Sequence, residues 1–191
     1  MNLVFGGSFN PPTIAHQNII KKLLSTYKGA RVLLLPVGDD YKKPELIPFS
    51  HRYLMLELLV KKINNATVLD IESRREYKGT LASLREINRM HDDLYFVIGS
   101  DQLKDFKTWI NYEELLESYP FIVMTREGSI SKEEFEEMFK NVKHHFTYLE
   151  FNENISSSAI RKSLKKHSGH LTPEVYQYIL KNHLYEEQNH V

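Results

Sequence analysis

The sequence predicts an α/β protein with a doubly wound parallel sheet and C-terminal helices. Short apolar runs alternate with stretches in which apolar residues recur at helical spacing. The apolar runs are continuous, which suits strands that are buried on both faces. Such strands belong to a parallel sheet whose crossover helices cover both sides.

The elements follow one another regularly along the chain. Strands are expected at residues 3–5, 32–35, 68–71, 95–98, 121–124 and 146–151. Helices are expected between them at residues 14–25, 51–62, 80–90, 112–118 and 131–140, the last being a glutamate-rich surface helix. Thr172 is a natural cap and Pro173 a natural first helical residue, so a final helix should run to Asn182.

Glycines follow three of the expected strands. Gly6 and Gly7 end the first strand, Gly38 follows the second and Gly99 the fourth. Glycine lets a backbone approach a ligand closely, and ligands of doubly wound sheets bind beyond the carboxyl ends of the strands. These positions predict a nucleotide site at that edge of the sheet.

Length and composition indicate the number of domains and exclude some classes of partner. A chain of 191 residues suits a single domain, 1–191, with a helical part from about residue 156. The formal net charge of zero argues against nucleic acid and membranes as partners, while a homodimer stays open. The lack of cysteine and of a signal-peptide pattern after Met1 favours a cytoplasmic protein. His144 and His145 have no further ligand at zinc spacing, so no protein-bound metal site is expected.

The segment after the first strand has features typical of an anion-binding site. A turn containing Ser8 leads into a helix whose first turn carries His16. The N–H groups of a helix N-terminus attract phosphate, and His16 is expected to add a cationic donor. Neither G-x-G-x-x-G nor G-x-x-x-x-G-K-[ST] occurs in the chain, and a tight turn with a surface histidine is the alternative.

A second segment strengthens the phosphate interpretation. Ile155 is followed by three serines, and Arg161 lies three residues beyond the last of them. One serine would suffice to cap a helix, which is the alternative interpretation. Three hydroxyls and a cation together suit a triphosphate, and Lys42 or Lys43 could enter the same site from the loop after the second strand.

Together these segments resemble the nucleotidyltransferase superfamily with H-x-G-H and I-S-S-x-x-x-R signatures, and within it the bacterial nicotinate-nucleotide adenylyltransferases. The resemblance covers nearly the whole chain. The sequence from Gly6 to Pro11 is similar to G-G-T-F-D-P, and Gly99, Asp101 and Trp109 are similar to the family's G-x-D and tryptophan segment. Residues 123–127, 175–179 and 184–185 also lie in family order.

The resemblance implies transfer of the AMP moiety of ATP to nicotinate mononucleotide, which yields deamido-NAD and pyrophosphate in NAD biosynthesis. Magnesium would be bound through the ATP phosphates. Catalytic roles would fall to His16, Lys42 and Arg161, and nicotinate mononucleotide would meet Gly79, Thr80 and Trp109. The expected ATP-binding residues are Gly7, Ser8, Phe9, Asp101, Ile155, Ser156, Ser157 and Ser158.

Three departures from the family pattern leave alternatives open. Thr13 and Ala15 stand at the positions of the first histidine and the glycine of H-x-G-H, residues 40–44 replace P-P-H-K, and residues 77–81 replace S-Y-T-x-D-T-L. The acceptor could therefore be another molecule, such as nicotinamide mononucleotide or phosphopantetheine, although Trp109 argues against the latter. The change at Thr13 also leaves open a nucleotide-binding module without turnover.

Overall fold

One parallel sheet organises the molecule. The structure is a computed structural model that describes residues 1–41, 43–74, 76–153 and 157–186. Within these residues, six parallel strands lie in the order β3-β2-β1-β4-β5-β6. They are β1 (Asn2–Gly7), β2 (Arg31–Pro36), β3 (Ala66–Val68), β4 (Leu94–Gly99), β5 (Phe121–Thr125) and β6 (Phe146–Glu150). The predicted doubly wound parallel sheet is confirmed.

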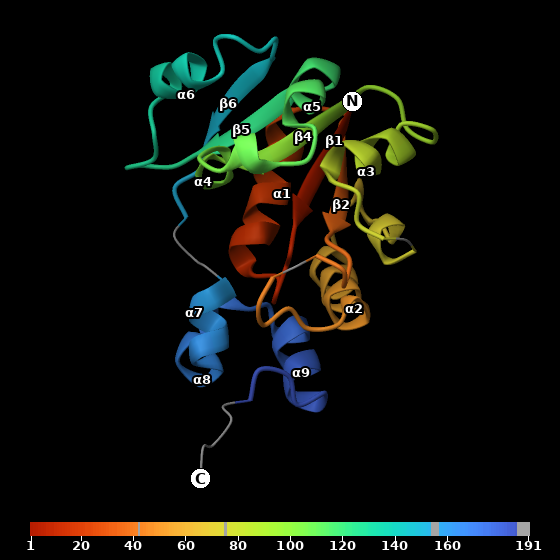
Figure 1. The fold of residues 1–191 in the computed structure, drawn as a ribbon. Helices are drawn as coiled ribbons and strands as arrows, with labels where there is room; N and C mark the ends of the chain where they lie inside the picture. Colours follow the sequence, from red (N-terminus) through yellow and green to blue (C-terminus); the bar gives the residue numbers. More distant parts are fainter. Residues whose placement is uncertain (42, 75, 154–156, 187–191) are drawn as a thin grey trace.

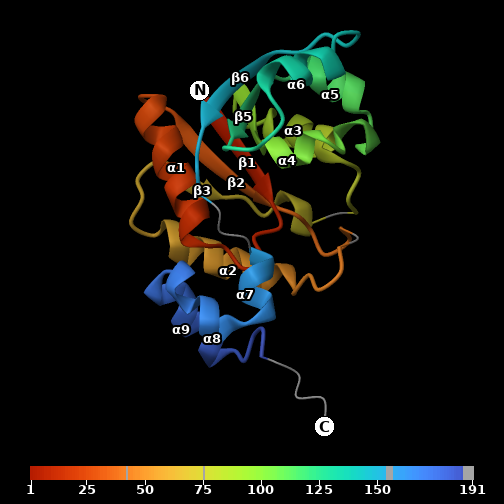
Figure 2. The same cartoon turned by 90° about the vertical axis from the view of Figure 1, so that its left-hand side faces the viewer.

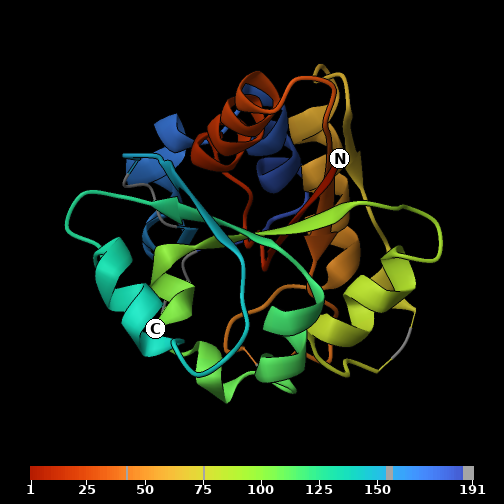
Figure 3. The ribbon, with the colours of Figure 1, turned by 90° about the horizontal axis from the view of Figure 1, so that it is seen from above.

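Helices cover both faces of the sheet (Figures 2 and 3). The first group is α1 (Ile14–Thr26), α2 (Phe49–Val60), α3 (Thr80–Ile87), α4 (Ser100–Leu103), α5 (Tyr112–Ser118) and α6 (Lys132–Met138). The C-terminal group is α7 (Ser157–Lys162), α8 (Leu164–His167) and α9 (Pro173–Lys181), and three short 3₁₀ turns are η1 (Ile71–Ser73), η2 (Phe106–Thr108) and η3 (Ser168–His170). No helix in the described part of the chain is long and apolar enough to span a bilayer.

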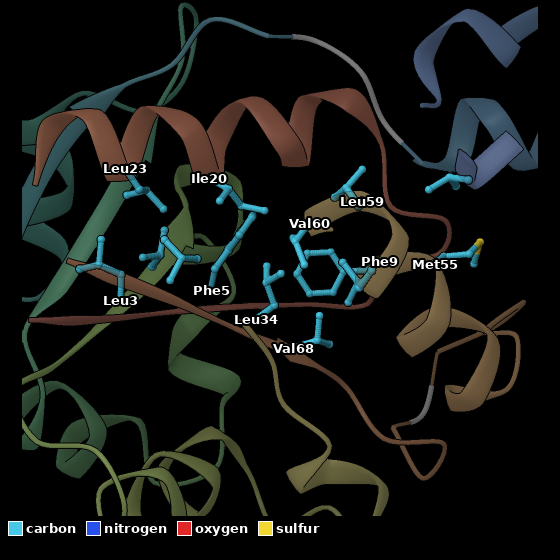
Figure 4. Close-up of a cluster of buried hydrophobic side chains, with 14 of the residues drawn as sticks. Leu3, Phe5, Phe9, Ile20, Leu23, Leu34, Met55, Leu59, Val60 and Val68 are labelled. Carbon is cyan, nitrogen blue, oxygen red and sulfur yellow. The ribbon is translucent and has the colours of Figure 1, made fainter. Parts of the chain in front are cut away.

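Alternate residues of β1 pack into two separate apolar cores, one on each face of the sheet. Leu3 and Phe5 pack with Ile20 and Leu23 of α1 (Figure 4), whereas Val4 packs with residues of α3 and β4 on the opposite face. The C-terminal helices contribute Ile160, Leu171, Val175 and Ile179 to the first of these cores. Because the helical part shares a core with β1, it is held rigidly beside the carboxyl edge of the sheet (Figure 1).

The strand order changes direction at β1. This strand pairs with β2 on one side and with β4 on the other, so the crossovers on its two sides leave toward opposite faces. The carboxyl ends of β1 and β4 therefore border the crevice in which doubly wound proteins bind ligands. Gly6 and Gly7 end β1, and Gly99 ends β4.

The third strand lies earlier than the sequence predicts. It covers Ala66–Val68 rather than residues 68–71, because the chain turns at Asp70 and its carbonyl accepts hydrogen bonds from the N–H and Oγ of Ser73. Ile71 is buried, but from the 3₁₀ turn η1. The turn brings Glu72 to the carboxyl edge, which the sequence did not indicate. The helix expected to reach Met90 ends at Ile87, and Met90 is exposed.

Candidate functional site

Among the described residues, cavities open at the carboxyl edge of the sheet, and two of them hold predicted site residues. The tryptophan cavity lies at the ends of β1 and β2 and is lined by Gly6, Gly7, Ser8, Tyr41, Lys43, Glu72, Tyr77, Thr80 and Trp109, among others. It adjoins a further hollow of about 380 Å³ that shares Tyr41, Tyr77 and Trp109. The histidine cavity lies at the ends of β4 and β5 and is lined by Ala15, His16, Gly99, Ser100, Asp101, Arg126 and Glu153, among others.

The turn after β1 is tightly packed. A Cβ on Gly6 would come within 3.0 Å of the Phe96 ring, and a Cβ on Gly7 within 3.1 Å of the Phe9 ring. The Phe9 ring is buried and lies edge-on to Phe5 and His16, with centroids 5.4 and 5.1 Å away. The Phe9 ring therefore belongs to the core and supports His16, and the contact of Phe9 with ATP stays a prediction.

His16 is held as a neutral hydrogen-bond donor. The backbone N–H of Thr13 donates to Nδ1 of His16 over 2.9 Å, so the neutral ring carries its proton on Nε2. Burial lowers the pKa of His16 from 6.5 to about 4. Without ligand the side chain is thus a neutral donor at neutral pH, whereas the sequence suggests a cationic one.

Thr13 caps the helix that carries His16. Its Oγ1 accepts from the His16 N–H while the His16 ring accepts from the Thr13 N–H, a reciprocal capping box. Thr13 is fully buried, and its Oγ1 lies 2.9 Å from Nδ1 of His16. The residue at the position of the family's first histidine therefore orients the second one.

The low pKa of His16 makes folding stability depend on pH. The unfolded chain binds the proton at His16 more readily than the folded one, so this residue costs no stability above about pH 6.5 and lowers the free energy of unfolding increasingly as the pH drops toward 4. We expect the melting temperature of His16→Gln to fall less between pH 7.5 and pH 5 than that of the wild type. His145→Gln, at an exposed position, is the control and should follow the wild type. An equal fall in the wild type and His16→Gln would contradict the assignment.

Lys43 reaches the turn after β1 from the loop after β2. Its Nζ donates to Oγ of Ser8 over 3.1 Å. Desolvation and the nearby Arg161 guanidinium lower the pKa of Lys43. Lys42, for which the family resemblance implies a catalytic role, lies outside the described residues.

Arg161 joins α7 to the same turn. Its Nη1 donates to the main-chain oxygen of Asn10 over 2.7 Å, and its Nε lies 3.2 Å from a carboxylate oxygen of Glu45. The Oγ of Ser157 donates to the carbonyl of Pro11 over 2.8 Å. These contacts bring the arginine to the glycine-serine turn from 151 residues away in sequence.

The remaining predicted ATP residues divide into two groups. Asp101 lies on α4 in the histidine cavity, where it forms an ion pair with Arg126. Ser158 occupies the second position of α7 and is exposed. Ile155 and Ser156 lie outside the described residues. The structure thus brings His16 and Asp101 to one cavity, and Lys43, Ser8 and Arg161 to the adjoining turn.

Trp109 and Thr80 line the tryptophan cavity together. The indole packs on Phe106, with ring centroids 4.7 Å apart, and remains partly exposed. Thr80 opens α3, and Gly79 before it has a φ of +92°, a backbone conformation that favours glycine. A Cβ on Gly79 would lie 3.0 Å from the Cβ of Ile110, so a side chain there would crowd the segment that carries Trp109.

Sequence reasoning missed several polar residues of the site. Glu72 is buried in the tryptophan cavity, where its carboxylate accepts from the Gly38 N–H (3.2 Å) and the Ser83 hydroxyl (2.7 Å). Tyr77 forms a hydrogen bond with Thr80 and lies edge-on to Tyr41. Glu72 stands at no motif position, and only the turn at η1 brings it to the cavity. Tyr77 begins the segment 77–81 that replaces S-Y-T-x-D-T-L, but the sequence assigned it no role of its own.

Arg52 is a buried charge behind the site. Its guanidinium donates to the carbonyl of Ile47 (2.8 Å), the carbonyl of Ser8 (3.1 Å) and the carboxylate of Asp39 (3.3 Å). Asp39 in turn accepts from the Phe49 N–H over 2.6 Å, which starts α2 two residues before the expected position. Arg52 therefore ties the turn after β1 to the loop after β2, and a buried charge whose three nitrogens each donate a hydrogen bond rigidifies both.

The chain is similar to known proteins over nearly all of its length. Residues 4–163 match the family model described as cytidylyltransferase-like. A probable nicotinate-nucleotide adenylyltransferase of Acholeplasma laidlawii is 38% identical over 188 residues, which cover 98% of each chain. A second, from Carboxydothermus hydrogenoformans, is 35% identical over 194 residues, which cover 95% of this chain and 96% of the relative.

Solved structures share the fold. Plasmodium falciparum nicotinic acid mononucleotide adenylyltransferase complexed with NaAD superposes with a TM-score of 0.79 at 23% identity, over 96% of each chain. The same enzyme complexed with APC has a TM-score of 0.76. Sequence and fold agree, and the chain belongs to the cytidylyltransferase-like family and, within it, to the nicotinate-nucleotide adenylyltransferase family.

Proposed function

We propose that this protein transfers the AMP moiety of ATP to nicotinate mononucleotide and forms deamido-NAD and pyrophosphate. The observation that carries the proposal is the pair of cavities at the carboxyl ends of neighbouring strands. One holds the single tryptophan, the other holds His16 and Asp101, and Lys43 and Arg161 bind the turn after β1. This arrangement suits two nucleotides whose phosphates meet near that turn.

The reaction requires no protein nucleophile. A phosphate oxygen of the acceptor attacks the α-phosphorus of ATP, the bond to the bridging oxygen toward the β-phosphorus breaks, and pyrophosphate leaves. The protein must align the phosphates and stabilise the charge that develops on them. Nε2–H of His16 and the cations of Lys43 and Arg161 are donors of the required kind, and Ser8 and Ser157 add hydroxyls.

Magnesium would enter with ATP in this proposal. The donors around the turn are cations and hydroxyls, which suit phosphate oxygens, and the carboxylate of Asp101 is already paired with Arg126. The metal would therefore be held mainly by the ATP phosphates and water, where it neutralises charge on the leaving pyrophosphate.

Removal of magnesium should abolish the activity. We expect pyrophosphate release to fall to background in excess chelator and to return when magnesium is added beyond the chelator concentration. Full activity in excess chelator would contradict phosphoryl-transfer chemistry of this kind.

The acceptor is expected to carry a carboxylate. The N-terminus of α3 lies at Gly79 and Thr80, and Gly79 has no side chain with which to cap its first N–H groups. The backbone N–H of Thr80 forms a hydrogen bond with the Tyr77 hydroxyl, so an acceptor carboxylate would replace that contact. Charge-assisted hydrogen bonds from N–H groups to a carboxylate are roughly twice as strong as neutral ones. An amide would present its own donors to these donors. The buried carboxylate of Glu72 opposes this preference, but it already accepts two hydrogen bonds within the protein.

Nicotinate mononucleotide should therefore exceed nicotinamide mononucleotide by at least about tenfold in kcat/KM, which corresponds to about 1.4 kcal/mol. Trp109→Ala should lower kcat/KM for both acceptors and leave their ratio nearly unchanged, because the indole meets only the ring. Trp109→Phe, which keeps an aromatic face, is the matched control. Equal use of both acceptors by the wild type would contradict the acid-selective site.

The decisive experiment combines purified protein, ATP, magnesium and each acceptor in turn. Pyrophosphate release should be fastest with nicotinate mononucleotide, and the dinucleotide product should be identifiable by mass. ATP binding without turnover for any acceptor would instead support a nucleotide-binding module. The change at Thr13 no longer favours that alternative, since Thr13 orients His16.

A further inference from the structure

Tyr185 connects the end of the described chain to the turn after β1. Its phenol donates a hydrogen bond to Oδ1 of Asn10 over 2.6 Å, from 175 residues away in sequence. The φ of Tyr185 is +57°, in the left-handed region that side chains other than glycine rarely adopt. Its contacts must therefore hold the residue in this conformation.

Asn10 also forms hydrogen bonds with two further segments of the chain. Its Nδ2 donates to the carbonyl of Glu45 over 2.8 Å, and its own main-chain oxygen accepts from Nη1 of Arg161 over 2.7 Å. Glu45 also pairs with Nε of Arg161. Asn10 is almost fully buried, at 1% exposure. Water cannot readily replace these hydrogen bonds, so the polar groups of Asn10 depend on their protein partners.

We propose that Tyr185 is a positioning residue for Arg161. The phenol fixes the side chain of Asn10, and Asn10 holds the guanidinium through its main-chain oxygen and through Glu45. Without the phenol, a buried amide oxygen loses its donor and the anchor of Arg161 loosens. The inference rests on the proposed function, because it takes Arg161 to bind the phosphates of ATP.

The ionisation of Tyr185 agrees with this role. Burial raises the pKa of the phenol, although Arg161 and Arg52 lie close enough to oppose the shift. The hydroxyl therefore stays protonated and remains a donor to Asn10 throughout the neutral range.

The test is removal of the single hydroxyl in Tyr185→Phe. We expect KM for ATP to rise about three- to tenfold, the effect of one lost hydrogen bond, while KM for nicotinate mononucleotide changes less than about twofold. The matched control is Tyr178→Phe on α9, which loses a hydrogen bond of 2.8 Å to Nδ1 of His51 and should leave KM for ATP unchanged. Melting temperatures of both variants report any general loss of stability.

A double variant separates positioning from structure. If Tyr185 acts through Arg161, Tyr185→Phe should have no further effect on KM for ATP in an Arg161→Ala background. Equal increases for both substrates, or an undiminished effect in that background, would overturn the inference. If Arg161→Ala has a large effect on KM for ATP but Tyr185→Phe has none, only the inference about Tyr185 is overturned. If Arg161→Ala has no effect, the inference and the proposed ATP site are both overturned.

Discussion

Replacement of His16 by alanine is expected to lower kcat about 100- to 1,000-fold, the typical cost of losing one preorganised donor to developing charge. The donor is a neutral Nε2–H, because Thr13 holds Nδ1 and burial keeps the pKa of the ring near 4. Its orientation is set before the substrate arrives. The measurement is steady-state pyrophosphate release at saturating ATP and acceptor.

Two further variants distinguish this role from helix capping. His16→Glu keeps the S/T-x-x-E capping pattern with Thr13, so α1 should remain stable, but it places a negative charge beside the phosphates and should be inactive. Thr13→Ala keeps the backbone N–H that holds Nδ1 and should cost about tenfold or less. An active His16→Glu enzyme would show that His16 only caps the helix.

Replacement of Arg161 by alanine is expected to lower kcat/KM for ATP by about 100-fold or more, since a forked cation is lost from a site that must hold polyphosphate. Its guanidinium is already fixed by Asn10 and Glu45, and its side chain is only 15% exposed. Little ordering entropy should therefore oppose phosphate binding.

The control variants for Arg161 test geometry and charge separately. Arg161→Lys keeps the charge but loses the fork, and we expect it to recover only part of the activity. Lys162→Ala removes an exposed cation from the neighbouring position of α7 and should be almost silent. Similar losses in Arg161→Ala and Lys162→Ala would indicate a general electrostatic effect rather than a specific contact.

Local patterns in the sequence determined much of the fold. Continuously apolar runs identified the first five strands of the described sheet, because a strand buried on both faces is continuously apolar, whereas the last, β6, is only half-buried and contains polar residues. Only the third was misplaced, since the buried Ile71 belongs to a 3₁₀ turn rather than to the strand. The helix at 112–118 was placed correctly, and Thr172 and Pro173 begin α9 as predicted.

The sequence by itself also determined the edge of the sheet where the site would lie, since glycines after strands one, two and four meet there in any doubly wound sheet. Only the tertiary structure decided the state and partners of the residues at that edge. The neutral His16 follows from burial, and the places of Glu72, Arg52, Asn10 and Tyr185 follow from contacts between residues far apart in the chain. A local pattern reports which residues are apolar and how they are spaced. It does not report which distant polar group a side chain meets, and that contact sets its charge and orientation.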